Sequence, residues 1–331
     1  MEQGRRVGDE SALRRCLERI ATGRFGPAAR VVGVHRTRLP AIGSYDCDAV
    51  GVELEDGSRL ALFLKDFAFS RLSKDDRELR RDRELHVYRD LLAAAELGTP
   101  RYYGSLWDES AGRFWLILEH VEGAVVKQVD AESGALAAAW LARLQGHFLH
   151  RRERLEASEW LIRHDAAFFR AKAEAAGRDV AELSPSSSAA FASVLERYGR
   201  AVDVMLAQPQ SLVHGGYIPW HVLIDAGREP TRVCAVDWEL AAIGATLYDL
   251  AFFTDGVDAE VCAPIERAYR EAAATHGVPV PDEAELPRVM GCFRLHRILD
   301  WLSRGVEKQF TDRKVAKLVA QAGRVAERAL G

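Results

Sequence analysis

The chain has 331 residues, of which 48% are hydrophobic and 28% are charged. This length exceeds that of a usual single core, so we expect one or two lobes with real hydrophobic cores and exclude disorder as the dominant state. The 45 Lys and Arg residues and the 49 Asp and Glu residues leave a net charge of −4. The two signs alternate along most of the chain, so nothing indicates nucleic-acid binding.

Apolar runs such as residues 135–141 are far shorter than the roughly 20 residues that span a bilayer, and the polar N-terminus has no signal-peptide core. The five cysteines show no CxxC or Cys/His ligand spacing, which argues against a structural zinc site. We therefore expect reduced thiols in a soluble, cytoplasmic protein that has no membrane partner.

A β-hairpin is expected near the N-terminus. Residues 49–54 alternate between apolar and polar, Asp56-Gly57 is a strong turn signal, and residues 60–67 form the returning strand. This strand carries Lys65 near its end.

The highly charged segment 73–92 has leucines and a tyrosine at near-helical spacing, which predicts an amphipathic helix that carries Glu84. Together with strands near residues 31–34, 101–107 and 113–119, the hairpin and this helix make a small first lobe over residues 1–122. Residues 1–29 form an Arg-rich, helical extension that either caps this lobe or docks a protein partner.

From residue 123 the sequence changes to long helical patterns and predicts a larger, mostly helical second lobe over residues 123–331. Helices are expected at 135–148, 158–175, 187–207, 260–276, 286–303 and 311–330. Short strands rich in Val, Leu and Ile lie within 211–225 and 231–239, where polar residues also concentrate. The predicted fold class is therefore α+β.

The segments 212–225 and 233–239 carry the strongest motif. They resemble the catalytic loop and the metal-binding strand of the aminoglycoside phosphotransferase and choline kinase-like family, a branch of the protein-kinase-like fold. The family pattern is His-Gly-Asp, four variable residues, Asn, an aliphatic run and Ile-Asp-Trp-Glu. The matching residues are His214, Gly215, Pro219, Val222, Leu223, Val236, Asp237, Trp238 and Glu239. The resemblance implies a bilobal fold, with a small antiparallel sheet and one key helix in the N-lobe and a helical C-lobe.

The resemblance implies ATP and Mg²⁺ as cofactors. Kinase-like sites use a strand lysine to hold the nucleotide phosphates and a helix glutamate to orient it, and Lys65 and Glu84 lie in the right elements. Asp237 is the expected magnesium ligand, because an ionised carboxylate at the end of a buried strand is costly unless a metal or donors neutralise it. Glu119 and Val121 lie in a segment that resembles the linker whose backbone binds adenine.

The phosphate-covering loop is expected within residues 36–45. Only one glycine is present there, so Gly43 and Ser44 either present backbone N–H groups to phosphate or form an ordinary hairpin turn.

Two departures from the family pattern affect the mechanism. Gly216 stands where the family has its catalytic aspartate, and His221 stands where it has a metal-binding asparagine. Glycine cannot accept a proton, and imidazole suits magnesium poorly because magnesium prefers oxygen ligands. The base is therefore absent, supplied by the substrate, or replaced by another residue such as Glu239 or His221, whereas His214 is expected to support the loop structurally.

Three functions remain open. The first is transfer of the terminal phosphate of ATP to a hydroxyl of a small molecule or of a biosynthetic peptide. The second is a pseudokinase-like module that binds nucleotide and a partner protein without turnover. The third is other ATP chemistry, such as nucleotidyl transfer.

Overall fold

The computed structural model describes residues 2–40, 43–72 and 74–331, and the chain divides into two compact units. The first unit consists of Met1–Ala124 and Asp225–Glu239, and the second consists of Val125–Ile224 and Leu240–Gly331. The segment 225–239, which contains Asp237, therefore belongs to the first unit. The sequence had placed this segment in the second lobe, which was expected to begin at residue 123.

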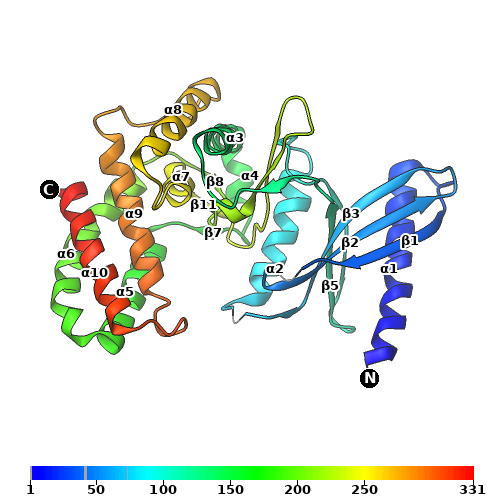
Figure 1. The fold of residues 1–331 in the computed structure, drawn as a ribbon, viewed down its shortest axis with the longest axis horizontal. Coiled ribbons are helices and arrows are strands. Elements are labelled where there is room, and N and C mark those ends of the chain that lie inside the picture. The colour runs from blue at the N-terminus through cyan, green and yellow to red at the C-terminus, as the bar shows by residue number, and fades with distance from the viewer. Residues whose placement is uncertain (1, 41–42, 73) are drawn as a thin grey trace. The chain divides into compact units, whose positions relative to one another are not determined.

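The first unit is built around an antiparallel five-stranded sheet with the strand order β1-β2-β3-β5-β4. The strands and helices of this unit are α1 (Glu2–Phe25), β1 (Val31–Arg38), β2 (Tyr45–Leu54), β3 (Arg59–Ser70), α2 (Arg77–His86), β4 (Tyr102–Asp108), β5 (Arg113–Glu119) and β10 (Arg232–Ala235). All five strands predicted from the sequence are present (Figure 1).

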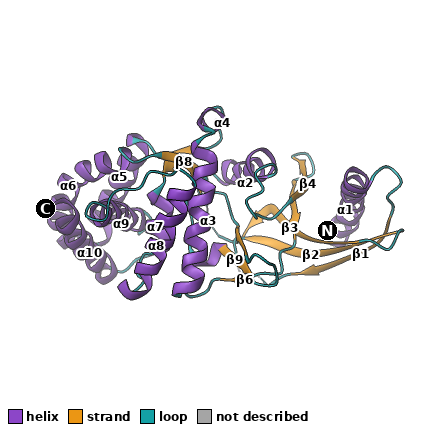
Figure 2. Ribbon diagram, turned by 90° about the horizontal axis from the view of Figure 1, so that it is seen from above, coloured by secondary structure: helices purple, strands orange, loops and turns teal. Residues whose placement is uncertain are grey.

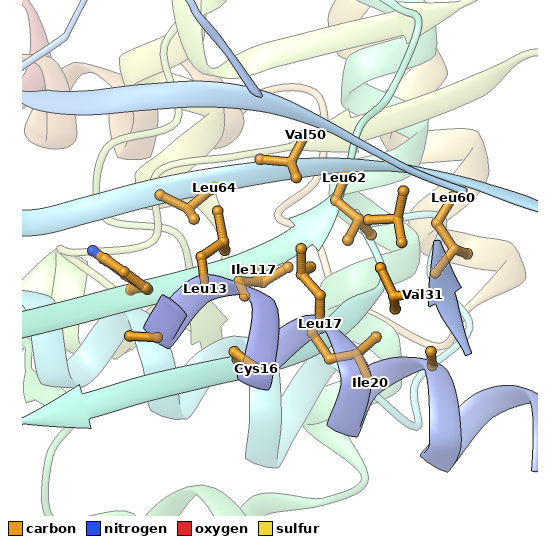
Figure 3. Packing of buried hydrophobic residues seen from close by; sticks show 14 of the residues in the cluster. Leu13, Cys16, Leu17, Ile20, Val31, Val50, Leu60, Leu62, Leu64 and Ile117 are labelled. Atoms are coloured by element: carbon orange, nitrogen blue, oxygen red, sulfur yellow. The ribbon is translucent and has the colours of Figure 1, made fainter. Parts of the chain in front are cut away.

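The helix α1 covers one face of this sheet. The alternating pattern of β2 places Val50, Val52 and Leu54 on that face, where they are buried. Figure 3 shows Leu13 and Leu17 of α1 lying among the buried side chains of the sheet. Burial of each such side chain contributes about 1.5–3 kcal/mol. The N-terminal extension therefore caps the sheet, which is one of its two expected roles.

The helix α2 occupies part of the charged segment predicted to be helical, and the chain continues as a π-helix over Val87–Leu92. Its sequence is almost entirely charged, yet Glu84 and Leu85 are buried, as are Arg81 and Arg83. Charged groups of this helix are thus taken into the interior of the unit, which requires that they be paired there.

The second unit is mostly helical, as Figure 2 shows for the helices α3 to α10. These helices are α3 (Ala131–Leu149), α4 (Arg152–Glu156), α5 (Ala166–Leu183), α6 (Ser188–Leu206), α7 (Leu247–Phe253), α8 (Ala259–Thr275), α9 (Leu286–Leu302) and α10 (Asp312–Leu330). A small sheet of β7 (Ile162–Arg163), β11 (Ala242–Ala245) and β8 (Gln210–Val213) lies among them. The short strands β6 (Ala124–Val125) and β9 (Val222–Asp225) lie at the unit boundaries in the sequence.

One helix lies eight residues further along the chain than the sequence predicts. The expected helix at 158–175 begins only at Ala166, because Ile162 and Arg163 pair with β11 and Asp165 caps the helix by accepting a hydrogen bond from the Phe168 N–H. The side-chain cap fixes the start of α5, and a strand of two residues is too short to be read from an apolar pattern.

Among the described residues, no helix combines the length and the apolar character needed to cross a membrane.

Candidate active site

A buried ion pair joins the sheet to α2. The Lys65 ammonium of β3 donates hydrogen bonds to both carboxylate oxygens of Glu84, at 2.9 and 2.7 Å, and the two side chains are 9% and 2% exposed. The residues are 19 positions apart in the sequence. The structure therefore brings together the lysine and the glutamate that the sequence singled out.

Asp237 joins the same pair. Its Oδ1 accepts a hydrogen bond from the Lys65 ammonium at 2.7 Å, across a separation of 172 residues. Its backbone has φ of 69°, in the left-handed region that non-glycine residues adopt at a cost of about 1–3 kcal/mol. The following Trp238 is fully buried and its indole N–H donates to the Ala235 carbonyl at 3.1 Å. A strained backbone fixed in this way is typical of a functional position.

Glu239 lies beside this group and is surrounded by cations that sequence reasoning missed. Its carboxylate accepts hydrogen bonds from Lys74 and, at 3.2 Å, from Arg80. Its backbone carbonyl accepts one from Arg83 at 2.6 Å. Glu239 was one of the candidates for a replacement base, but both of its carboxylate oxygens are already engaged by Lys74 and Arg80. It is thus poorly placed to take a proton from an acceptor.

Oxygen atoms of Glu84, Asp237 and Glu239 all lie within 4.8 Å of one another. Carboxylate oxygens are the donors that magnesium prefers, so the chemistry of this set fits the ion that the sequence implies. Both oxygens of Glu84 are bonded to Lys65. Asp237 is the most exposed of the three, with 30% of its side chain accessible. Asp237 is therefore the residue best able to hold the ion.

The electrostatics of the cluster reflect its burial. Burial alone would lower the pKa of Lys65, but the carboxylates of Asp237 and Glu84 outweigh it and raise this pKa well above its usual range. Burial raises the pKa of Glu84 to about 7, although the Lys65 ammonium acts in the opposite direction. Lys65 therefore stays protonated as an ammonium, with the carboxylates of Asp237 and Glu84 close to it.

The segment expected to bind adenine lies at the end of β5. The Glu119 N–H donates to the Arg101 carbonyl and its carboxylate forms a two-pronged pair with Arg232, at 2.7 and 2.8 Å. The His120 N–H donates to the Ala61 carbonyl. Among the described residues, the backbone of Val121 forms no hydrogen bond. Glu119 is therefore fixed in the sheet, whereas the backbone groups of Val121 are available for hydrogen bonds to a ligand.

The expected phosphate-covering loop is described only in part, because Ala41 and Ile42 lie outside the described residues. Gly43 is exposed and Ser44 is half-buried, and both precede β2 directly. Their carbonyl oxygens accept hydrogen bonds from the side chain and the backbone of Arg71, respectively. These carbonyls therefore tie the end of the loop to the residues after β3.

In the second unit, the loop 214–221 is anchored by Asp249. Its carboxylate accepts hydrogen bonds from the backbone N–H groups of His214 and Gly215, at 2.6 and 3.0 Å. Burial raises the pKa of Asp249 to about 7, while these two N–H groups lower it. His214 is fully buried and its Nδ1 accepts a hydrogen bond from the Gly216 N–H at 3.3 Å. Asp249 and His214 thus shape the loop.

His221 contacts the same loop. Its Nδ1 lies 2.8 Å from the carbonyl oxygen of Gly216. A carbonyl only accepts hydrogen bonds, so Nδ1 is the protonated nitrogen in this contact, and in the neutral form of the ring Nε2 is the acceptor atom. The contact also fixes the orientation of the ring within the loop.

The two glycines of the loop differ in what they allow. Gly215 has φ of +75°, and a Cβ there would lie 2.1 Å from the Leu240 carbonyl oxygen, so only glycine fits. A Cβ at Gly216 would instead meet Leu240 at 3.5 Å and the rings of His214 and His221 at 3.8 Å, all ordinary contacts. The position of the missing aspartate therefore has room for a side chain.

Two aromatic residues of the loop differ in their surroundings. Tyr217 is buried, stacks on Trp140 and donates a hydrogen bond to the Ala137 carbonyl at 2.9 Å. Trp220 is 51% exposed. Tyr217 therefore packs the loop onto α3.

A family model of the phosphotransferase enzyme family, APH, matches residues 44–287, about three quarters of the chain. The matched range contains Lys65, Glu84, Asp237 and the loop 214–221. No curated protein sequence is significantly similar to the chain.

Solved structures of kinase-like enzymes share the fold. The macrolide 2'-phosphotransferase MphH from Brachybacterium faecium has a TM-score of 0.55 at 15% identity, over 93% of this chain and 97% of its own. The GDP and kanamycin complex of APH(2")-IIia has a TM-score of 0.60 at 14% identity, over 94% and 98%. Choline kinase LicA from Streptococcus pneumoniae has a TM-score of 0.52 at 15% identity, over 94% and 99%. The predicted α+β, protein-kinase-like fold class is confirmed.

Proposed function

Because the chain belongs to the phosphotransferase enzyme family, we propose that it transfers the terminal phosphate of ATP to a hydroxyl group of a small molecule or of a biosynthetic peptide. The observation that carries this proposal is the buried set of Lys65, Glu84 and Asp237. Residues so far apart in the sequence are held together at the cost of burying charge, which a purely structural cluster does not need.

In this proposal, the first unit binds the nucleotide. The backbone of Val121 binds the adenine ring, and N–H groups of Gly43 and Ser44 face the phosphates. Lys65, oriented by Glu84, donates hydrogen bonds to phosphate oxygens. Asp237, with Glu239 beside it, holds the magnesium ion, which when bound neutralises charge on the phosphates.

The second unit supplies the base. With Gly216 in place of an aspartate, we assign proton acceptance to Nε2 of His221, because Nδ1 is bonded to the Gly216 carbonyl and Nε2 is the acceptor atom of the neutral ring. The acceptor oxygen forms a bond to the terminal phosphorus, the bond to the bridging oxygen breaks and ADP leaves, and the hydroxyl proton passes to His221. Phosphoryl transfer depends mainly on positioning and charge stabilisation, so an unusual base is compatible with turnover.

The test combines binding and turnover. We expect ATP with Mg²⁺ to raise the melting temperature of the protein and to be turned over with release or transfer of phosphate, and Asp237→Ala to abolish turnover. Asp203→Ala, an exposed residue of α6, is the control and should behave as wild type. An Asp237→Ala variant with wild-type turnover would refute the proposal. Mass spectrometry of the product distinguishes a transferred phosphate from a transferred nucleotide.

A nucleotide-binding module without turnover is the second candidate, and the absence of a side chain at Gly216 favours it. Both oxygens of Asp249 accept hydrogen bonds from the loop backbone, so this carboxylate does not replace the missing aspartate. For such a module, ATP would stabilise the folded protein by mass action while no product forms with any acceptor.

A further inference from the structure

Tyr45 lies next to the ammonium groups of the first unit and belongs to none of the roles above. It opens β2 directly after Gly43 and Ser44 and is 3% exposed. The centre of its ring lies 4.5 Å from Nζ of Lys74 and 5.4 Å from Nζ of Lys65. Phe67 packs edge-on against the ring at 4.8 Å. The ring is thus fixed in place and lies against both cations.

Two side chains in this region have donors that no acceptor in the described part of the chain uses. The Tyr45 hydroxyl is buried and has no hydrogen-bond partner among the residues that the structure describes. Lys74 is 10% exposed, and of its three N–H donors only one has an acceptor within residues 2–40, 43–72 and 74–331, namely the one bonded to Glu239. Leaving buried donors unpaired costs about 1–3 kcal/mol each, so a ligand that accepts from them gains correspondingly.

The chemistry of these donors selects a phosphate group. Burial raises the pKa of Tyr45 to about 12, and the charge of Glu239 acts in the same direction, so the phenol remains an O–H donor at neutral pH. A phenolic O–H and an ammonium are both donors that match the oxygen atoms of a phosphate, to which charge-assisted hydrogen bonds are short and strong.

We propose that the Tyr45 hydroxyl and the Lys74 ammonium bind the phosphate chain of the nucleotide, and that Lys74 supplies a fixed positive charge to it. This inference rests on the proposed function of the site. In protein kinases, two metal ions neutralise the phosphates. In this chain, the Lys74 ammonium supplies part of that neutralisation, and this part does not depend on a metal ion.

The alternative is that Lys74 serves only as the ion-pair partner of Glu239. It would then affect the nucleotide only through a metal ion held by Glu239 and Asp237. Binding measured without metal separates the two explanations, and so does a ligand without phosphates.

The experiment measures equilibrium binding of ATP and of adenosine by titration calorimetry, each in Mg²⁺ and in EDTA. The variants are Tyr45→Phe, Lys74→Gln and Lys74→Arg, with Lys308→Gln at an exposed position as control. We expect Lys74→Gln to weaken ATP binding by about tenfold and Tyr45→Phe by about three- to tenfold, in both buffers, because hydrogen bonds to charged groups are lost. Lys74→Arg should retain most of the affinity, and adenosine binding should not change.

Each remaining outcome overturns a specific statement. Wild-type affinity of Lys74→Gln and Tyr45→Phe for ATP would overturn this inference while leaving the proposed function intact. A loss seen in Mg²⁺ but not in EDTA would assign Lys74 to the metal site through Glu239. An equal loss for adenosine would show that the variants distort the unit, which melting of the ligand-free proteins checks. If wild type binds neither ligand, the proposed function fails.

Discussion

The two units differ in the polar contacts that hold their candidate site residues. In the first unit, these residues form ion pairs: Lys65 with Glu84 and Asp237, and Lys74 with Glu239. In the second unit, the loop 214–221 is held by backbone hydrogen bonds to the Asp249 carboxylate and to the His214 ring. Glycine and histidine stand in this loop where the family pattern has an aspartate and an asparagine. The groups expected to serve the nucleotide are thus retained, whereas those expected to serve the acceptor have changed. Nucleotide binding and phosphate transfer can therefore be tested as separate properties of this chain.

The largest expected effect comes from restoring the family pattern in the second unit. Gly216→Asp with His221→Asn places a carboxylate where a Cβ meets only ordinary contacts, so the loop should accept it. A positioned base contributes about 10²- to 10⁴-fold, and we expect ATP turnover to exceed that of a variant without a base by a factor in this range, in a steady-state phosphate-release assay. The matched control is Gly216→Asn with His221→Asn, which has the same shape without the charge. Equal rates for the two double variants would show that a carboxylate at position 216 does not restore phosphate transfer. The loop would then depart from the family pattern by more than these two side chains.

The next effect concerns the buried charge of the first unit. Glu84→Gln removes one of the two carboxylates bonded to Lys65, and breaking a buried pair costs up to about 3–5 kcal/mol. Urea denaturation should show a corresponding loss in the free energy of unfolding. The pair between Arg59 and Glu53 in the same sheet, whose side chains are 78% and 37% exposed, provides the comparison. Glu53→Gln should cost less than about 1 kcal/mol. Similar losses for the two variants would contradict the assignment of Glu84 to a buried, charged site.

The smallest expected effect is a pH dependence of stability that arises from two buried histidines of the second unit. Burial lowers the pKa of His164 to about 3 and that of His296 to about 4, so both are neutral in the folded second unit. An unfolded histidine binds a proton below about pH 6.5. The unfolded state therefore binds more protons than the folded state between about pH 6.5 and 4, and stability falls as the pH is lowered through this window.

Replacing His164 removes one such group. His164→Phe keeps an aromatic ring beside Phe168 and Tyr248, whose centres lie 4.3 and 4.4 Å away. Its free energy of unfolding should fall less steeply than that of wild type, by up to about 1.4 kcal/mol per pH unit. Chemical denaturation at several pH values measures the difference. Parallel curves for the two proteins would mean that His164 is already protonated in the folded state.

Sequence reasoning located most elements because their patterns are local. The alternation over residues 49–54 and the Asp56-Gly57 turn correctly predicted β2 and its hairpin, and the long helical periodicities predicted six helices. The helix α5 was misplaced because its start depends on the pairing of residues 162–163 with β11, a contact that no local pattern encodes.

The candidate site was predictable only in part. The motif around Asp237 and the strand position of Lys65 pointed to a shared site, and the structure brings these two residues together with Glu84. Lys74 and Tyr45 were not identified. A lysine in a segment as charged as 73–92 looks solvated, and a tyrosine at the start of a strand looks like part of the core.

The sequence by itself determined the alternating strands and the helical periodicities, because each follows from backbone geometry over a few residues. Only the tertiary structure decided which charges are buried. On a helix as uniformly charged as α2, nothing local distinguishes Glu84 from its exposed neighbours. The distinction arises when β3 places Lys65 opposite it and the distant segment 225–239 adds Asp237, because a charge is stable in the interior only where its partners are.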